Sequence, residues 1–130
     1  MTVDGLDHVN VRTRDMAATV AFYTDVLGLS AAAPPRGLDP ARITWMHDSA
    51  GRALFHLTAT DGDVAETTGA VDHVALNCSG HAAMVARLDR LGVPYRLNEV
   101  SSIDLRQVFV TDPGGVLLEL NFRSGNHSQT

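Results

Sequence analysis

The chain has no lysine and a single cysteine, Cys78, among its 130 residues. Without lysine it can form neither a Schiff base with a carbonyl substrate nor the lysine–phosphate contact of a P-loop. One cysteine excludes an internal disulfide, so we expect a reducing compartment, the cytoplasm. Cys78 stands in an apolar, strand-like context, which favours a buried structural thiol over a nucleophile.

Long apolar runs and an excess of positive charge are also missing. No stretch approaches the roughly 18–20 apolar residues of a membrane span, and the polar, acidic start is unlike a signal peptide, so we expect no membrane partner. The ten basic residues are all arginine, and the formal net charge is −5. Because phosphate binding needs a basic face, this charge argues against nucleic acid as a partner. The length suits one compact domain.

Two segments of the chain are alike. Residues 6–12 read Leu-Asp-His-Val-Asn-Val-Arg and residues 71–77 read Val-Asp-His-Val-Ala-Leu-Asn, and each precedes a predicted helix that ends in Leu-Gly. Offsets of 65, 64 and 63 residues separate His8 from His73, Gly28 from Gly92, and His56 from Glu119. Small changes in loop length produce such a drift, so the pattern indicates an internal repeat.

Each half is predicted to contain a strand, a helix and three strands. In the first half, the strand covers 6–12, the helix runs from the N-cap Asp15 to Gly28, a proline-rich loop flanked by a short strand covers 30–40, and a hairpin joins 42–47 to 53–58. In the second half, the strand covers 71–77, the helix covers 81–91 and ends at Gly92, and strands cover 95–100, 105–111 and 116–122. The first module is thus 5–59, the linker 60–70, the second module 71–123 and a polar tail 124–130.

The period of two in a strand sorts side chains by face. Residues expected to share a face with His8 are Asn10 and Arg12, and those expected to share a face with Glu119 are Leu117 and Asn121. By the same rule, Ala75 and Asn77 accompany His73, and Leu54 and Thr58 accompany His56. Four metal-competent side chains, one from the first and last strand of each half, are then expected to meet: His8, His56, His73 and Glu119.

Three imidazoles and one carboxylate suit a divalent Fe, Ni, Co, Zn or Mn ion. In six-coordination they leave two positions for substrate oxygens or water, and an open position distinguishes a catalytic metal from a structural one. We therefore expect one divalent metal ion per site. Whether His56 is a ligand stays open, because a lone strand histidine is more often a core residue. His47 and His81 are expected to be surface or structural residues, and His127 lies in the tail.

Four motifs resemble the vicinal oxygen chelate (VOC) superfamily, which includes glyoxalase I, methylmalonyl-CoA epimerase, fosfomycin-resistance enzymes, extradiol dioxygenases and bleomycin-resistance proteins. They are Leu6-Asp7-His8-Val9, Phe22-Tyr23-x-x-Val26-Leu27-Gly28-Leu29, Val71-Asp72-His73-Val74 and Phe109-x-x-Asp112-Pro113-x-Gly115-x-x-x-Glu119, and the match spans about residues 5–122. The resemblance implies an α+β fold of two βαβββ modules that form an eight-stranded, curved, incompletely closed sheet around a divalent metal. It places the four ligands at His8, His56, His73 and Glu119. It also implies a homodimer, with each site formed within one chain or by a module from each of two chains.

Two departures from the family pattern narrow the chemistry. Extradiol dioxygenases carry a tyrosine where this chain has Phe109, and a catalytic histidine in the region that here covers 101–106, so both acid–base groups of catechol cleavage are missing. Glyoxalase I commonly has a carboxylate or glutamine where this chain has His56. A second metal-bound carboxylate is therefore not available as a base.

The leading hypothesis is a metal-dependent isomerase or lyase of glyoxalase or epimerase type, which acts on a small oxygen-chelating substrate through a metal-stabilised enolate. Glu119 is the expected base, and metal-bound hydroxide is the alternative. The residues expected to orient the substrate or line its pocket are Asn10, Arg12, Trp45, Gln107, Phe109 and Asn121. The loops 31–41 and 61–69 are expected to set specificity.

Two other functions stay open. If His56 is not a ligand, His8, His73 and Glu119 form the two-histidine, one-carboxylate set of non-haem Fe(II) dioxygenases. The third hypothesis is a non-catalytic protein that binds a small molecule, as bleomycin-resistance proteins do. Such members tend to lose metal ligands, whereas this chain keeps four candidates.

Overall fold

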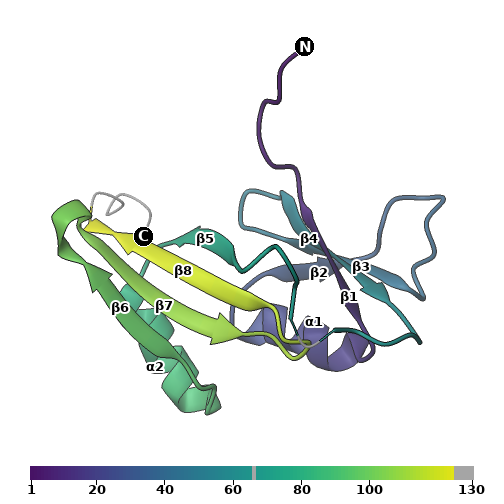
Figure 1. The fold of residues 1–130 in the computed structure, drawn as a ribbon. Coiled ribbons are helices and arrows are strands. Elements are labelled where there is room, and N and C mark those ends of the chain that lie inside the picture. The colour runs from purple at the N-terminus through teal and green to yellow at the C-terminus, as the bar shows by residue number, and fades with distance from the viewer. Residues whose placement is uncertain (66, 125–130) are drawn as a thin grey trace. The chain divides into compact units, whose positions relative to one another are not determined.

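Two units, Met1–Val64 and Ala65–Thr130, carry the same order of elements: a strand, a helix and three strands (Figure 1). The computed structural model describes residues 1–65 and 67–124. Residue 66 of the predicted linker and residues 125–130 of the predicted tail, His127 included, lie outside that description. The predicted α+β fold of two βαβββ modules is confirmed, and the eight strands form two four-stranded sheets.

The first unit consists of β1 (Val9–Thr13), α1 (Met16–Asp25), β2 (Ser30–Ala32), β3 (Ile43–His47) and β4 (Ala53–Ala59), with strand order β1-β4-β3-β2. The second consists of β5 (Val74–Cys78), α2 (His81–Leu91), β6 (Arg96–Val100), the short 3₁₀ helix η1 (Ser101–Ile103), β7 (Leu105–Thr111) and β8 (Leu117–Arg123), with strand order β5-β8-β7-β6. The first strand of each unit pairs parallel to the last, and the other neighbours are antiparallel.

Helix α1 begins at the predicted cap, since the Asp15 side chain accepts a hydrogen bond from the Ala18 backbone N–H at 3.0 Å. Its regular part ends at Asp25, before the predicted stop at Gly28, although the Val26 N–H still donates to the Phe22 carbonyl at 2.9 Å. Gly28 then adopts a φ of 72°, which reverses the chain. Tyr23 is fully buried, and its ring lies 4.8 Å from that of Phe55 on β4.

Helix α2 ends as predicted at Gly92, which adopts the left-handed conformation. Its buried residues are Met84 and Leu88, and the ring of His81 meets that of Phe122 edge-on at 5.3 Å. In both units the helix therefore covers one face of the sheet, where alternate strand residues such as Leu57 and Leu120 are fully buried. We call the other face, which carries the polar residues discussed below, the open face of each sheet.

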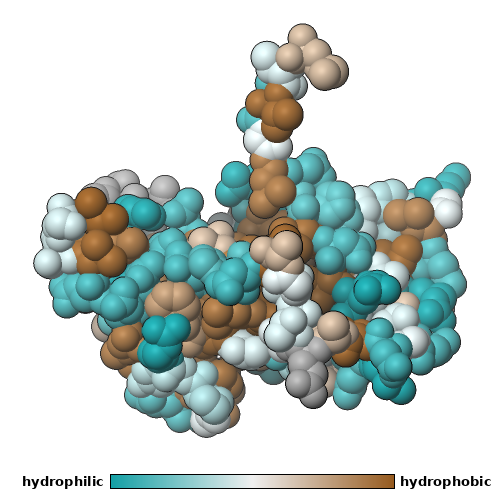
Figure 2. Space-filling view, in the orientation of Figure 1, coloured by the Kyte–Doolittle hydropathy of each residue, from teal (hydrophilic) through white to brown (hydrophobic). Residues whose placement is uncertain are grey.

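The first strand of each unit starts later than the alternation predicts. Strand β1 begins at Val9 and β5 at Val74, because these are the first residues that pair with β4 and β8. Residues 1–7 precede the sheet of the first unit and carry the exposed apolar side chains Val3 and Leu6. Figure 2 shows brown, hydrophobic atoms along this N-terminal segment. In the described part of the chain, no helix has the length and apolar character to cross a membrane.

Cys78 lies at the end of β5, half-buried, and its Sγ–H donates to the Leu76 carbonyl at 3.7 Å. Burial raises the pKa of this thiol to about 11. Because the thiolate is the reactive form of cysteine, this environment matches a structural thiol.

We expect Cys78 to react with iodoacetamide at pH 8 roughly 100-fold more slowly in the folded protein than in denaturant, because a pKa of about 11 leaves about 0.1% thiolate at that pH. The rate should rise about tenfold per pH unit up to that pKa. Mass spectrometry of quenched time points measures both rates. Equal rates in the folded and unfolded states would contradict this placement of the thiol.

Candidate metal and substrate site

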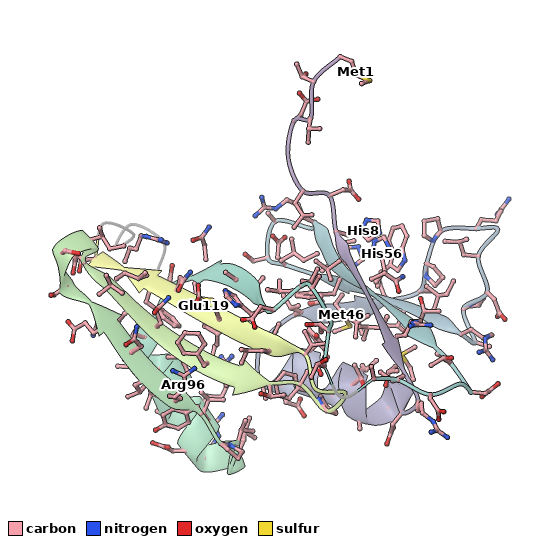
Figure 3. All side chains as sticks on the ribbon, viewed as in Figure 1. Met1, His8, Met46, His56, Arg96 and Glu119 are labelled. Atoms are coloured by element: carbon pink, nitrogen blue, oxygen red, sulfur yellow. The ribbon has the colours of Figure 1, made fainter. Side chains whose placement is uncertain are left out.

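In the first unit, three rings are stacked on the open face of the sheet. Register places Asn10 of β1, His56 of β4 and Trp45 of β3 side by side. The His56 ring lies 3.6 Å from the His8 ring and 3.9 Å from the Trp45 ring, nearly parallel to both. The two neighbours therefore cover opposite faces of the His56 ring. Figure 3 labels His8 and His56 next to each other at this point.

In the second unit, a histidine and a carboxylate meet on the open face. His73 directly precedes β5, and its Nε2 lies 3.6 Å from Oε1 of Glu119 on β8. The His73 side chain is 37% exposed and that of Glu119 is 15% exposed. Both groups are thus accessible from solvent and close enough to share one small ligand.

The two pairs occupy equivalent places in their units. His56 pairs with Asn10, two residues after His8, and Glu119 pairs with Ala75, two residues after His73. The neighbouring strands β3 and β7 are also equivalent, because Trp45 of β3 pairs with His56 just as Phe109 of β7 pairs with Glu119. Register thus bears out the repeat at residue level, with imidazole in one unit where the other has carboxylate.

Sequence reasoning missed the role of two aspartates. The Nδ1–H of His8 donates to Asp7 at 2.6 Å, and that of His73 donates to Asp72 at 2.7 Å. A carboxylate on Nδ1 fixes the imidazole tautomer and leaves Nε2 as the atom that can bind a metal. The signal was present in the sequence, since Asp-His occurs at the same point of both repeats.

Electrostatics differ between the three histidine environments. The pKa of Asp7 is lowered by the hydrogen bond from His8, and that of His73 is raised by its hydrogen bond to Asp72 and, more weakly, by the charge of Glu119. Burial lowers the pKa of His56, with a further contribution from His8. His56 is therefore biased toward the neutral form, which is the form that coordinates metals.

The donor chemistry of both pairs fits a divalent transition metal, since imidazole nitrogen and carboxylate oxygen suit such ions and no thiolate is nearby. Within each unit, however, the described residues offer a pair of donors and not a group of three or more.

The other predicted site residues lie on the same open faces. In the first unit, Asn10 Nδ2 donates to Thr58 Oγ1 at 3.1 Å, and Arg12, which pairs with Thr58, is exposed. In the second unit, the Arg96 guanidinium lies 4.3 Å above the Phe109 ring (Figure 3). This cation–π contact holds a positive charge one strand away from Glu119.

Gln107 and Asn121 are only 8% exposed and are hydrogen-bonded to one another. Asn121 also donates to the second oxygen of Glu119. His47, at the end of β3, and His81, at the start of α2, belong to neither pair.

Comparison with solved structures finds the same fold over most of the chain. A glyoxalase family protein from Bacillus anthracis is 20% identical over 95% of this chain and 98% of that one, with a TM-score of 0.76. A glyoxylase/bleomycin resistance protein/dioxygenase domain from Frankia sp. EAN1pec is 22% identical over 97% of both chains, with a TM-score of 0.72.

A fosfomycin resistance protein from Listeria monocytogenes, solved as a glutamate-to-glutamine mutant with Mn(II) and 1S,2S-dihydroxypropylphosphonic acid, is also similar. It is 18% identical over 92% of this chain and 90% of that one, with a TM-score of 0.70. No curated protein sequence matches the chain significantly.

The sequence also matches a family model over residues 5–120, which includes every residue of the two donor pairs. The chain therefore belongs to the Glyoxalase/Bleomycin resistance protein/Dioxygenase superfamily.

Proposed function

We propose that the protein is a metal-dependent isomerase or lyase that acts on a small substrate with two neighbouring oxygen atoms. The observation that carries this proposal is the presence of two equivalent donor pairs, each with a histidine whose Nδ1 is held by a carboxylate. A hydrogen-bonded core histidine needs no such repetition at matched register positions. The Mn(II) and the vicinal diol in the fosfomycin resistance protein support the same kind of site.

The ligands in this proposal are His8 and His56 from the first unit and His73 and Glu119 from the second. A divalent ion bound by them would act as a Lewis acid toward the two substrate oxygens. The ion is Fe, Ni, Co, Zn or Mn by the chemistry of the donors. We further propose a cytoplasmic homodimer, in which the two pairs come either from one chain or from both.

Glu119 is the residue that we propose moves a proton. Its Oε1 faces His73, while its Oε2 accepts a hydrogen bond from Asn121 at 3.0 Å. A carboxylate in this position can take a proton from a carbon next to a carbonyl and return it to the neighbouring carbon or oxygen. On the same faces, Asn10, Arg12 and Trp45 of the first unit, and Phe109 with Arg96 of the second, can contact the remainder of the substrate.

One observation favours a second function. His56 has both ring faces covered, by His8 and Trp45, and no aspartate among the described residues is hydrogen-bonded to its ring nitrogens. If His56 serves only as a packing residue, His8, His73 and Glu119 remain as the ligand set of a non-haem Fe(II) oxygenase. Oxygen-dependent turnover with Fe(II) would favour this function, and anaerobic turnover with Ni, Co or Zn would favour the first.

Substitution of single ligands tests the site. We expect His8→Ala and His73→Ala to weaken Co(II) binding at least about 100-fold, more than the loss of an outer-sphere partner costs, because each removes a donor atom. His56→Ala should do the same if His56 is a ligand and should leave the affinity within about threefold if it is not. Isothermal titration calorimetry, in which Co(II) is added to metal-free protein, measures both the affinity and the number of ions bound per chain.

The matched control is His47→Ala, because His47 lies one strand away from His56 and belongs to neither donor pair. It should bind Co(II) as the unsubstituted protein does. Failure of the unsubstituted protein to bind any divalent ion would refute the metal-dependent functions. Tight binding of a small molecule that survives His8→Ala and Glu119→Ala would instead identify a non-catalytic binding protein.

The aspartates that hold His8 and His73 should contribute to metal affinity almost as much as the ligands themselves. We expect Asp7→Asn and Asp72→Asn each to reduce metal affinity about 10- to 100-fold, because an amide no longer enforces the tautomer with Nε2 free. The same titration gives the values, and circular dichroism checks that these exposed substitutions leave the fold intact. A similar affinity for all three proteins would show that the two carboxylates are only surface ion pairs.

Glu119→Gln tests the base. We expect it to lower proton exchange at the carbon next to a carbonyl at least about 100-fold, because glutamine cannot accept the proton. Proton NMR in D₂O can follow exchange on α-hydroxyketones and the hemithioacetal of methylglyoxal and glutathione, with fosfomycin included to test epoxide opening. Unchanged exchange in the metal-loaded variant would assign the base to another group.

A further inference from the structure

We propose that Gln107 and Asn121 are positioning residues for Glu119, and that they act through a relay of three amides that begins at Asn98. This inference rests on the proposed metal site, because it concerns how one of its ligands is held. It differs from the sequence-based expectation that Gln107 and Asn121 contact the substrate. Figure 3 labels Glu119 on β8, the strand at which the relay ends.

The relay crosses three neighbouring strands. Asn98 Nδ2 of β6 donates to Gln107 Oε1 of β7 at 2.7 Å, and Gln107 Nε2 donates to Asn121 Oδ1 of β8 at 3.2 Å. Asn121 Nδ2 then donates to Glu119 Oε2 at 3.0 Å. Register explains the alignment, because Asn98, Gln107 and Asn121 are direct partners across the sheet and therefore share its open face.

The charge of Glu119 sets the direction of the relay. An ionised carboxylate only accepts hydrogen bonds, so Asn121 must turn its amide nitrogen toward Glu119. The Asn121 oxygen then faces Gln107 and requires a donor there, and the Gln107 oxygen requires a donor from Asn98. Since Gln107 and Asn121 are almost fully buried, neither can exchange these partners for bulk water without a cost.

The consequence for the site is a fixed division between the two oxygens of Glu119. The relay occupies Oε2, and Oε1 is left facing His73 Nε2 at 3.6 Å. Buried hydrogen bonds in such a network strengthen one another and restrict rotation of the carboxylate. Oε1 is therefore the atom presented for metal coordination or proton transfer.

The first unit has no equivalent relay among its described residues. In the second unit, Asn121 pairs across the sheet with Asn77 and Gln107. At the equivalent place in the first unit, Thr58 pairs with Arg12 and Ile43. The group at the position of Glu119 is His56, which is held by ring stacking instead. The relay thus occurs in the unit that carries a carboxylate, as expected if its role is to hold that carboxylate.

Gln107→Met tests the relay without contact with Glu119, since it keeps the length of the side chain and removes both polar atoms. We expect Co(II) affinity in the absence of substrate to fall about 3- to 30-fold, within or just below the effect of losing an outer-sphere partner. The matched control is Asn77→Leu. Asn77 lies in the same row on the other side of Asn121, but its oxygen accepts from Arg123 at 3.0 Å and takes no part in the relay.

The outcomes separate the two proposals. The relay is supported if Gln107→Met binds Co(II) more weakly than the unsubstituted protein while Asn77→Leu binds it equally well. Equal Co(II) affinities for both variants and the unsubstituted protein overturn the relay. An effect of Gln107→Met on KM alone, with unchanged Co(II) affinity, also overturns it and restores a substrate contact. If Gln107→Met does not fold, Asn98→Asp replaces it: weaker Co(II) binding despite the added negative charge supports the relay, and equal or tighter binding overturns it.

A second measurement does not depend on the metal. In metal-free protein, the side-chain amide protons of Asn121 should shift in Gln107→Met and stay in place in Asn77→Leu, as followed by heteronuclear NMR. If the unsubstituted protein binds no divalent ion, the proposed function fails, and this NMR comparison alone decides the relay. Unshifted Asn121 amide protons in Gln107→Met would then overturn it.

Discussion

Parallel pairing between the first and last strand of each unit is the constraint on which the candidate site depends. The pairing sets Asn10 beside His56 and Ala75 beside Glu119, so that the histidine two residues earlier reaches the side chain of the last strand. A slip of one residue in either pair would turn His56 or Glu119 toward the helix-covered face, where Leu57 and Leu120 are buried. The apolar core therefore enforces the positions of the polar donors.

On this shared scaffold, the two units hold their last-strand donors by different physical means. His56 is held by dispersion and ring stacking between His8 and Trp45. Glu119 is held by the hydrogen bond from Asn121 at the end of the amide relay, because a carboxylate has no ring face to stack and needs donors for its lone pairs. The side chains next to each donor differ accordingly: Arg12 and Thr58 in the first unit, Asn77 and Asn121 in the second.

Much of this architecture follows from local sequence patterns. The period of two placed the donors on one face of each strand, and the cap at Asp15 and the stop at Gly92 fixed helix ends that the structure confirms. The start of β1 and β5 and the turn η1 were not predicted, because they depend on which residues find a partner across the sheet. For the same reason, the link from Asn98 to Glu119 was missed: it joins three strands, and no spacing within one strand reveals it. The use of Gln107 and Asn121 as substrate contacts, and the joining of the two pairs around one ion, stay predictions.

The ring stack in the first unit also gives the protein an optical property. Trp45 is the one tryptophan in the sequence, and its indole lies almost parallel to the His56 imidazole. A cation on that imidazole, whether a proton or a coordinated ion, withdraws electron density next to the indole face. The tryptophan fluorescence of the protein therefore originates beside one candidate ligand, which makes the emission of Trp45 a reporter of the state of His56.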